Sequence, residues 1–251
     1  MIDILLPAFI VSLVLLGIHS YFGIRIIERN IIFTDLAIGQ TAALGAAVSL
    51  FFLNGDFMYP FSLFFALCAG AAILTVTGRS HHPEAVIGLM YALGISGVFL
   101  LLSKSPHGME EFQNLMACDI LYTRGRDTGF AAALYTAMGL ALFAAEKMAG
   151  KRVREWIFMT AFAVTVTSSV KIAGVLVVFA ILLAPAFIAM RIPRLKGRAV
   201  PTLFAAWAIG TAINMAAIYV SYRADLPTGY TVVFMNALCA VAVSFMTSER
   251  D

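Results

Sequence analysis

Two ionisable side chains stand inside apolar stretches near the N-terminus. His19 lies in the run VLLGIHSYF, and Asp35 lies in the run IIFTDLAIG. Imidazole nitrogens and carboxylate oxygens are common ligands of divalent metal ions. Ionisable groups inside a membrane are energetically costly, so a functional role is their default interpretation. Both residues are therefore candidates to contact a cation.

Each of these residues also has a structural interpretation. If the two helices that carry them pack antiparallel, His19 and Asp35 are offset by about three residues, or roughly 4.5 Å, and could face each other. Asp35 could instead cap its helix or form an ion pair with Arg25 or Arg29. His19 could be a hydrogen-bonded packing residue. The residues alone leave these alternatives open.

The elements that position these residues must lie in lipid. Of the 251 residues, 61% are hydrophobic and 12% are charged, whereas soluble domains have about 25% charged and 45–50% apolar residues. Long blocks are apolar all round, which is typical of buried or membrane-spanning helices. The composition therefore predicts an all-α integral membrane protein that forms a single domain, residues 1–251.

About 20 apolar residues are needed to cross the hydrocarbon core as a helix. The sequence predicts about nine such spans, at residues 5–26, 31–53, 59–78, 85–103, 128–145, 155–170, 172–190, 201–222 and 229–247. The division at 170–172 is the weakest, because only Ser168, Ser169 and Lys171 separate its two spans. Eight spans remain an alternative.

The stretch 104–126 is too polar to span a membrane. It predicts an interfacial segment outside the cell, with a helix over residues 112–122.

The distribution of basic residues predicts the orientation, because cytoplasmic loops keep an excess of Lys and Arg. With nine spans, one side collects most of the 17 basic residues. The residues on that side are Arg25, Arg29, Arg79, Lys147, Lys151, Arg152, Arg154, Arg191, Arg194, Lys196, Arg198 and Arg250. The chain is therefore expected in the cytoplasmic membrane, with its N-terminus outside and its C-terminus inside.

Five segments in a fixed order resemble the zinc/manganese/iron permease family of ABC importers. They are LGIHSYFGIRIIERNIIFTDLAIGQTAALG (16–45), EAVIGLMYALG (84–94), LMACDIL (115–121), VKIAGVLVVFAILLAPAFIAM (170–190) and DLPTGYTVVF (225–234). The fourth is the most telling, since it is similar to the family's Val-Gly-Val-Leu-Leu-Val run that ends in an intramembrane Pro-Ala. Together the segments cover most of the chain.

This resemblance implies a fold like that of the larger vitamin and siderophore importers, called type II ABC importers. It implies a divalent metal ion, zinc, manganese or iron, as substrate, and no cofactor in this chain. The implied partners are a second copy of the permease, a cytoplasmic ABC ATPase dimer that binds ATP, and an extracytoplasmic metal-binding protein that delivers the ion.

The chain departs from the family at its second helix. Family members carry an Asp followed four residues later by a His, and these two line the ion path. Here Gly39 follows Asp35 by four residues, and alignment places Gln40 where the His would be. Residues five apart diverge by about 140° on a helix, so Asp35 and Gln40 cannot be a same-face ligand pair. The candidate metal residues are Asp35, His19, which could supply the missing imidazole, and Gln40, whose amide oxygen is a weaker partner for Zn²⁺ than imidazole.

The resemblance also suggests where the ATPase attaches. By position, the basic stretch EKMAGKRVR (146–154) matches the family's coupling loop. The candidate contact residues are Glu146, Lys147, Gly150, Lys151 and Arg152. Anchoring by positive charge on the cytoplasmic side explains the same residues equally well.

One proline lies within a predicted span. Pro185 removes a backbone hydrogen bond, so it predicts either a hinge or a static kink.

Several function classes have no support in the sequence. There is no GxxxxGK[ST] loop and neither a HExxH nor a GxSxG motif, so no enzymatic activity is expected and ATP hydrolysis would require a partner. The basic loops are short, so no nucleic-acid partner is expected. The alternatives that remain are a self-sufficient carrier or channel and a non-transporting anchor subunit.

Overall fold

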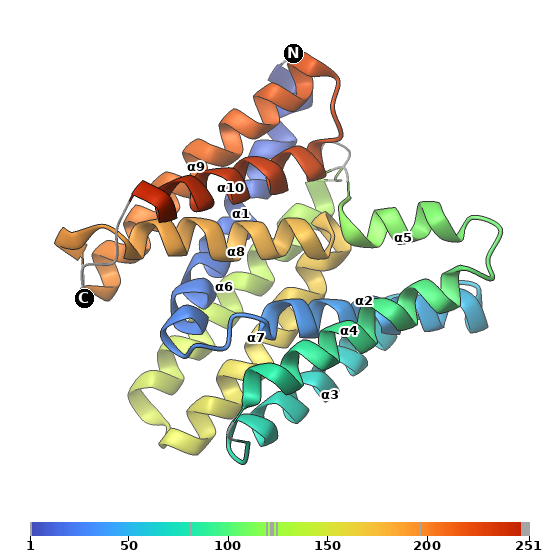
Figure 1. Ribbon diagram of the computed structural model, residues 1–251, viewed down its shortest axis with the longest axis horizontal. Helices are drawn as coiled ribbons and strands as arrows, with labels where there is room; N and C mark the ends of the chain where they lie inside the picture. Colours follow the sequence, from blue (N-terminus) through green and yellow to red (C-terminus); the bar gives the residue numbers. More distant parts are fainter. Residues whose placement is uncertain are drawn as a thin grey trace.

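The computed structural model describes residues 2–80, 82–118, 120, 123, 125–195 and 197–246. Within these residues the chain forms ten α-helices and a 3-10 turn at Pro193–Leu195 (Figure 1). The helices are α1 (Ile2–Glu28), α2 (Thr34–Leu53), α3 (Met58–Thr77), α4 (Pro83–Leu102), α5 (Gly108–Met116), α6 (Gly125–Met148), α7 (Lys151–Ala173), α8 (Val175–Met190), α9 (Ala199–Ala224) and α10 (Thr228–Met246).

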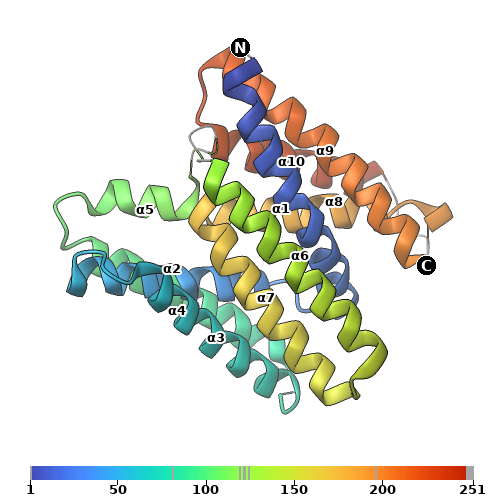
Figure 2. The same cartoon turned by 180° about the vertical axis from the view of Figure 1, so that it is seen from behind.

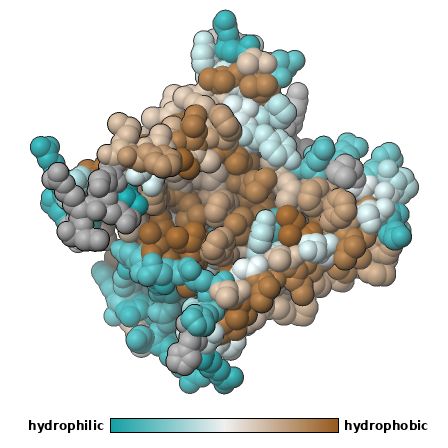
Figure 3. Space-filling model, in the orientation of Figure 1, coloured by the Kyte–Doolittle hydropathy of each residue, from teal (hydrophilic) through white to brown (hydrophobic). Residues whose placement is uncertain are grey.

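Nine of these helices correspond to the nine predicted spans. Eight are long and apolar enough to cross a membrane, and the ninth, α8, has 16 residues. At 1.5 Å per residue α8 is about 24 Å long, less than the roughly 30 Å of the hydrocarbon core. Apolar side chains cover the middle of the molecular surface between hydrophilic margins (Figure 3), as a bilayer requires.

The long helices alternate in direction. In Figure 1 the turns after α1, α3, α6 and α8 and the end of α10 lie along the left and lower left. The N-terminus, the turn after α2, helix α5 and the turn after α9 lie along the upper right. This is the alternation that nine segments predict, so α8 counts as one pass of the chain despite its length.

The boundary between α7 and α8 differs from the prediction. Helix α7 continues through Ser168 and Ser169 to Ala173, because both serine hydroxyls donate to the Thr165 carbonyl within the helix. The break comes at Gly174, whose φ is +84°. Only glycine adopts this backbone region readily, so the glycine and not the polar pair ends the helix.

The interfacial helix is also shifted. Helix α5 covers Gly108–Met116 instead of 112–122, and predicted positions 119, 121 and 122 lie outside the described residues. Its end is set by a tertiary contact, since Ala117 is extended and the Cys118 N–H donates to the Ala173 carbonyl at 3.0 Å.

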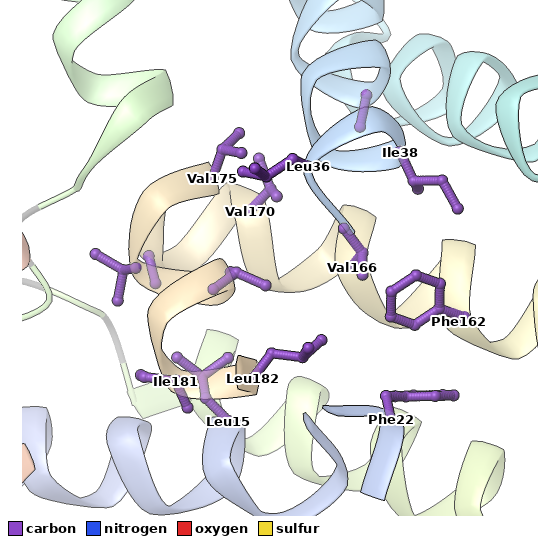
Figure 4. Close-up of a cluster of buried hydrophobic side chains, with 14 of the residues drawn as sticks. Leu15, Phe22, Leu36, Ile38, Phe162, Val166, Val170, Val175, Ile181 and Leu182 are labelled. Carbon is purple, nitrogen blue, oxygen red and sulfur yellow. The ribbon is translucent and has the colours of Figure 1, made fainter. Parts of the chain in front are cut away.

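Helices α7 and α8 form the centre of the bundle. Helix α8 packs against α1, α2, α7, α9 and α10, while α2 packs against α3, α4, α7 and α8. In Figure 4, Phe162 and Leu182 lie between Ile38 of α2 and Phe22 of α1. These side chains are buried. A hydrophobic layer from α7 and α8 therefore separates α1 from α2.

Small residues allow close helix contacts, as is usual in membranes, where burial of apolar groups gives no drive for helix association. A Cβ added at Gly23 of α1 would overlap the Leu182 carbonyl oxygen and lie 3.0 Å from Ala186 Cβ. The α1 and α8 backbones are therefore in direct contact, which fixes the depth of α1.

A buried amide pair joins α9 to α10. Asn236 Nδ2 donates to Asn214 Oδ1 at 2.8 Å, and both residues are fully buried. We expect Asn236→Leu to lower the free energy of unfolding by about 1 kcal/mol, because Asn214 loses its partner. Thermal unfolding in detergent measures this loss, and the double variant Asn214→Leu/Asn236→Leu should recover part of it. An Asn236→Leu protein as stable as wild type would contradict the prediction.

Candidate functional site

The Asp35 carboxylate is buried without a partner. Asp35 is 1% exposed in the first turn of α2, and neither of its oxygens has a hydrogen-bond partner among the described residues. Arg25 is paired with Glu28 and Glu146, and Arg29 with Glu155. The ion-pair and capping alternatives for Asp35 are therefore wrong.

The helix face that carries Asp35 points toward α7 and α8. Gly39, one turn further along the same face, lies against Val166 and Val170 of α7 and Val175 of α8. A Cβ at Gly39 would already be 3.0 Å from Val175 Cγ1. Valine side chains thus occupy the space in which a second ligand on α2 would lie.

Gln40 points in another direction. Its Nε2 donates to Met116 Sδ at 3.4 Å, and a Cβ added at Gly94 of α4 would be 2.9 Å from Gln40 Cβ. Gln40 Oε1 has no hydrogen-bond partner among the described residues. Gln40 therefore faces α4 and α5, while Gly39 faces α7 and α8. The side chain of Gln40 thus points away from the helix face of Asp35, as the five-residue spacing predicts.

His19 is held in one tautomer. Its Nδ1 lies 2.6 Å from the Leu15 carbonyl oxygen, and since a carbonyl only accepts, Nδ1 carries a proton. The lone pair of Nε2 is buried and has no partner among the described residues. The ring also meets Tyr135 of α6 edge-on, with centroids 5.9 Å apart. The hydrogen bond fits a packing role, and the free Nε2 leaves a ligand role open.

His19 and Asp35 do not face each other. The antiparallel packing of their helices that the sequence suggested is wrong, because α1 packs against α6, α8 and α9, on the other side of the α7–α8 layer from α2. In the described part of the chain, no three His, Cys, Asp or Glu side chains come together as a metal site. Asp35 is thus an isolated carboxylate in the bundle.

A polar cluster that sequence reasoning missed lies beside His19. Tyr135 Oη is 2.7 Å from Ser169 Oγ and 3.2 Å from Ser168 Oγ, and all three residues are buried. The buried Thr165 hydroxyl of α7 has no hydrogen-bond partner among the described residues. The hydroxyl residues within an otherwise apolar stretch could have indicated this cluster. The same residues fit a boundary between two spans equally well, so the sequence alone does not distinguish the two interpretations.

The predicted coupling segment forms a tight hairpin. Only residues 149 and 150 lie outside α6 and α7, so no separate coupling helix is present. Lys147 lies over the Phe143 ring at 4.3 Å, and a Cβ at Gly150 would meet nothing within 4 Å. We call residues 146–155, which include this segment and the next residue of α7, the α6–α7 hairpin.

Two ion pairs tie this hairpin to α1, which lies along α6 in Figure 2. Arg25 Nη2 donates to Glu146 Oε1 at 2.8 Å. Arg29 donates through both terminal nitrogens to Glu155, at 2.7 and 3.3 Å. Glu146 therefore faces α1, which the prediction of a coupling contact did not anticipate.

Lys151 and Arg152 face outward and line an open groove of about 490 Å³ between α3 and α7. Arg79 at the end of α3 and Trp156 of α7 also line it. Basic residues from two predicted cytoplasmic turns thus line one groove at this end of the bundle.

Pro185 lies inside α8, which continues through it to Met190. The ring is buried against α9, where a Cβ at Gly210 would come within 2.9 Å of Pro185 Cγ. The helix is not broken at this position, and the choice between hinge and static kink stays a prediction.

Comparisons with known proteins agree on the class of molecule. The profile of the ABC 3 transport family matches residues 1–247. Two solved structures are similar in fold. One is PsaBC from Streptococcus pneumoniae in complex with Fab, 18% identical, with 98% of this chain and 93% of that chain covered at a TM-score of 0.76. The other is an inward-facing conformation of a metal-chelate type ABC transporter, 14% identical, covering 96% and 85% at 0.73.

None of the curated proteins compared matches this chain. The family profile nevertheless extends over almost the whole sequence, and both similar structures reproduce the arrangement of its helices. The chain belongs to the ABC 3 transport family and is the membrane permease subunit of an ABC transporter, in which a separate subunit hydrolyses ATP.

Proposed function

We propose that this permease carries a divalent metal ion, zinc, manganese or iron, across the cytoplasmic membrane. The single observation behind this proposal is the Asp35 carboxylate, buried in the bundle with both oxygens unpartnered. A buried charge is strongly unfavourable unless an opposite charge approaches it. A passing cation supplies that charge, so Asp35 is the point at which the permease contacts its substrate.

An isolated carboxylate suits transport better than storage. Conduction requires that binding be favourable enough for the ion to enter and weak enough for it to leave. Gly39 and the valines around it add no second ligand on the Asp35 face of α2. Asp35 alone therefore holds the ion only briefly.

The α6–α7 hairpin is the proposed contact with the ATPase dimer, on the cytoplasmic side. Met148 and Val153 are 88% and 54% exposed, next to the exposed Lys151 and Arg152. Exposed apolar side chains beside basic ones at this end of the bundle form a surface on which a protein partner can dock. A second copy of the permease and an external metal-binding protein complete the proposed importer.

A metal that is already bound by a small chelator is a second candidate cargo. The same observation favours it, because Asp35 has no companion His on its face of α2 and Val175 occupies that space. One of the two similar structures is also described as a metal-chelate type transporter. A chelate brings its own ligands and needs few from the protein.

Uptake by the reconstituted complex tests the proposed function. We expect vesicles that contain the permease and its ATPase to accumulate radioactive zinc, manganese or iron only when ATP is present. The control is the same complex with an ATPase whose phosphate-binding lysine is replaced. Accumulation by the permease alone would show a carrier, and uptake only of citrate-bound iron would show the chelate as cargo. No ATP-driven uptake of either form would refute a metal importer.

A further inference from the structure

We infer that the ion pairs Arg25–Glu146 and Arg29–Glu155 form a clamp through which the α6–α7 hairpin positions the start of α2 and its Asp35. This inference rests on the proposed function, because it assigns to the clamp the transmission of the ATPase's movement. Of its four residues, the resemblance to known permeases singles out only Glu146, and it does so as an ATPase contact rather than as a partner of α1.

The clamp holds the hairpin at two points. Arg25 lies in the last turn of α1, and Arg29 directly follows the end of this helix at Glu28. Glu146 lies at the end of α6 and Glu155 at the start of α7, so each arm of the hairpin contributes one carboxylate. The two ion pairs therefore attach the end of α1 and the first residue after it to both arms of the hairpin.

The Arg29 contact is the better defined of the two. Its guanidinium forms two hydrogen bonds with Glu155, a geometry that fixes orientation as well as distance. The same guanidinium lies over the Phe158 ring at 4.3 Å. Phe158 in turn packs against Phe22 of α1, with ring centroids 5.5 Å apart. Arg29 is thus held by charge on one side and by an aromatic face on the other.

A short, hydrogen-bonded turn connects the clamp to Asp35. Asn30 follows Arg29 with a φ of +54°. The Ile31 N–H donates to the Ile26 carbonyl, and the Thr34 N–H donates to the Ile31 carbonyl. Ile31 and Thr34 are buried. A displacement of Arg29 is therefore transmitted to Asp35, six residues later, because the turn between them is held by hydrogen bonds and buried side chains.

The acidic and basic residues of the hairpin have different partners. Glu146 and Glu155 pair with Arg25 and Arg29, while Lys151 and Arg152 are exposed. An ATPase that pulls on the exposed side thus acts on α1 through the clamp, and the proposed metal contact moves with it.

The test measures how many metal ions the reconstituted importer moves for each ATP hydrolysed. We expect Glu155→Gln to leave a complex that assembles and hydrolyses ATP but whose transport per ATP falls about tenfold, a typical coupling effect between sites. Arg29→Lys keeps the charge but loses one of the two hydrogen bonds with Glu155. Its transport per ATP should lie between the values of Glu155→Gln and wild type. The exchanged pair Arg29→Glu/Glu155→Arg should restore part of the ratio.

Glu28→Gln is the matched control. It removes a carboxylate 3.6 Å from Arg25 that lies on α1 itself and does not reach the hairpin, so its ratio should equal that of wild type. An unchanged ratio in Glu155→Gln overturns the clamp and leaves the proposed function intact. If transport per ATP falls in Glu155→Gln and does not recover at all in the exchanged pair, the clamp is overturned as well. A wild-type complex that moves no metal refutes the proposed function instead, whatever the variants do.

Discussion

Replacing Asp35 with Asn should remove most of the metal uptake without weakening the fold. The substitution keeps the shape of the side chain and removes its charge, so the proposed contact with the cation is lost. We expect uptake by the reconstituted complex to fall at least about tenfold, the lower end of effects seen around metal sites. Because the carboxylate is buried without a partner, the free energy of unfolding should stay unchanged or rise by about 1 kcal/mol.

The two measurements together separate function from structure. A structural carboxylate would lose stability on neutralisation, whereas a substrate contact loses only uptake. Asp56→Asn, in the exposed turn between α2 and α3, is the control and should change neither quantity. If Asp35→Asn takes up metal at the wild-type rate, or unfolds at a clearly lower temperature, Asp35 is not the point of contact.

The positions of the helices follow from local properties of the sequence. A run of apolar residues long enough to cross a bilayer can be recognised without knowledge of its neighbours, and all nine predicted runs are helices. One boundary error has a local cause, because Gly174 and not the serine pair ends α7. The other occurs where a distant contact decides. Helix α5 ends where Cys118 bonds to Ala173, a pairing that no pattern within residues 104–126 contains.

The packing of the helices follows from the sequence much less. The helices that carry His19 and Asp35 are joined by a short turn, so the simplest expectation was that these two helices pack antiparallel against each other. The chain instead places α7 and α8 between them, and only the shapes of side chains such as Phe162 and Leu182 decide that choice. The burial of Asp35 was predictable from its apolar surroundings, but its lack of a partner was not.

The clamp shows the same limit over a longer range. Arg25 and Glu146 are 121 residues apart in the chain, and Arg29 and Glu155 are 126 apart. Positive charge near a span end is expected on the cytoplasmic side whatever its partner. The sequence therefore predicts the side on which these arginines lie and gives no indication that two acidic residues of the hairpin meet them.

Replacing Gly174 with Ala should destabilise the protein by several kcal/mol, about the sum of a backbone and a packing cost. Gly174 joins α7 to α8 with φ +84° and ψ +161°, a region that only glycine enters readily, and a residue with a side chain loses roughly 1–3 kcal/mol there. The added Cβ would also lie 2.7 Å from the Ala117 backbone, and such overpacking costs about 1–3 kcal/mol more. Unfolding of the purified permease in detergent measures the sum.

Gly139→Ala on α6 is the matched control for this substitution. A Cβ at Gly139 meets nothing within 4 Å, and in a helix interior alanine is favoured over glycine by about 0.5–1 kcal/mol. The same added methyl group should therefore stabilise α6 and destabilise the α7–α8 junction. Equal effects of the two substitutions would mean that the junction relaxes freely. The central α7–α8 layer would then not be rigid enough to fix the positions of Asp35 and the clamp.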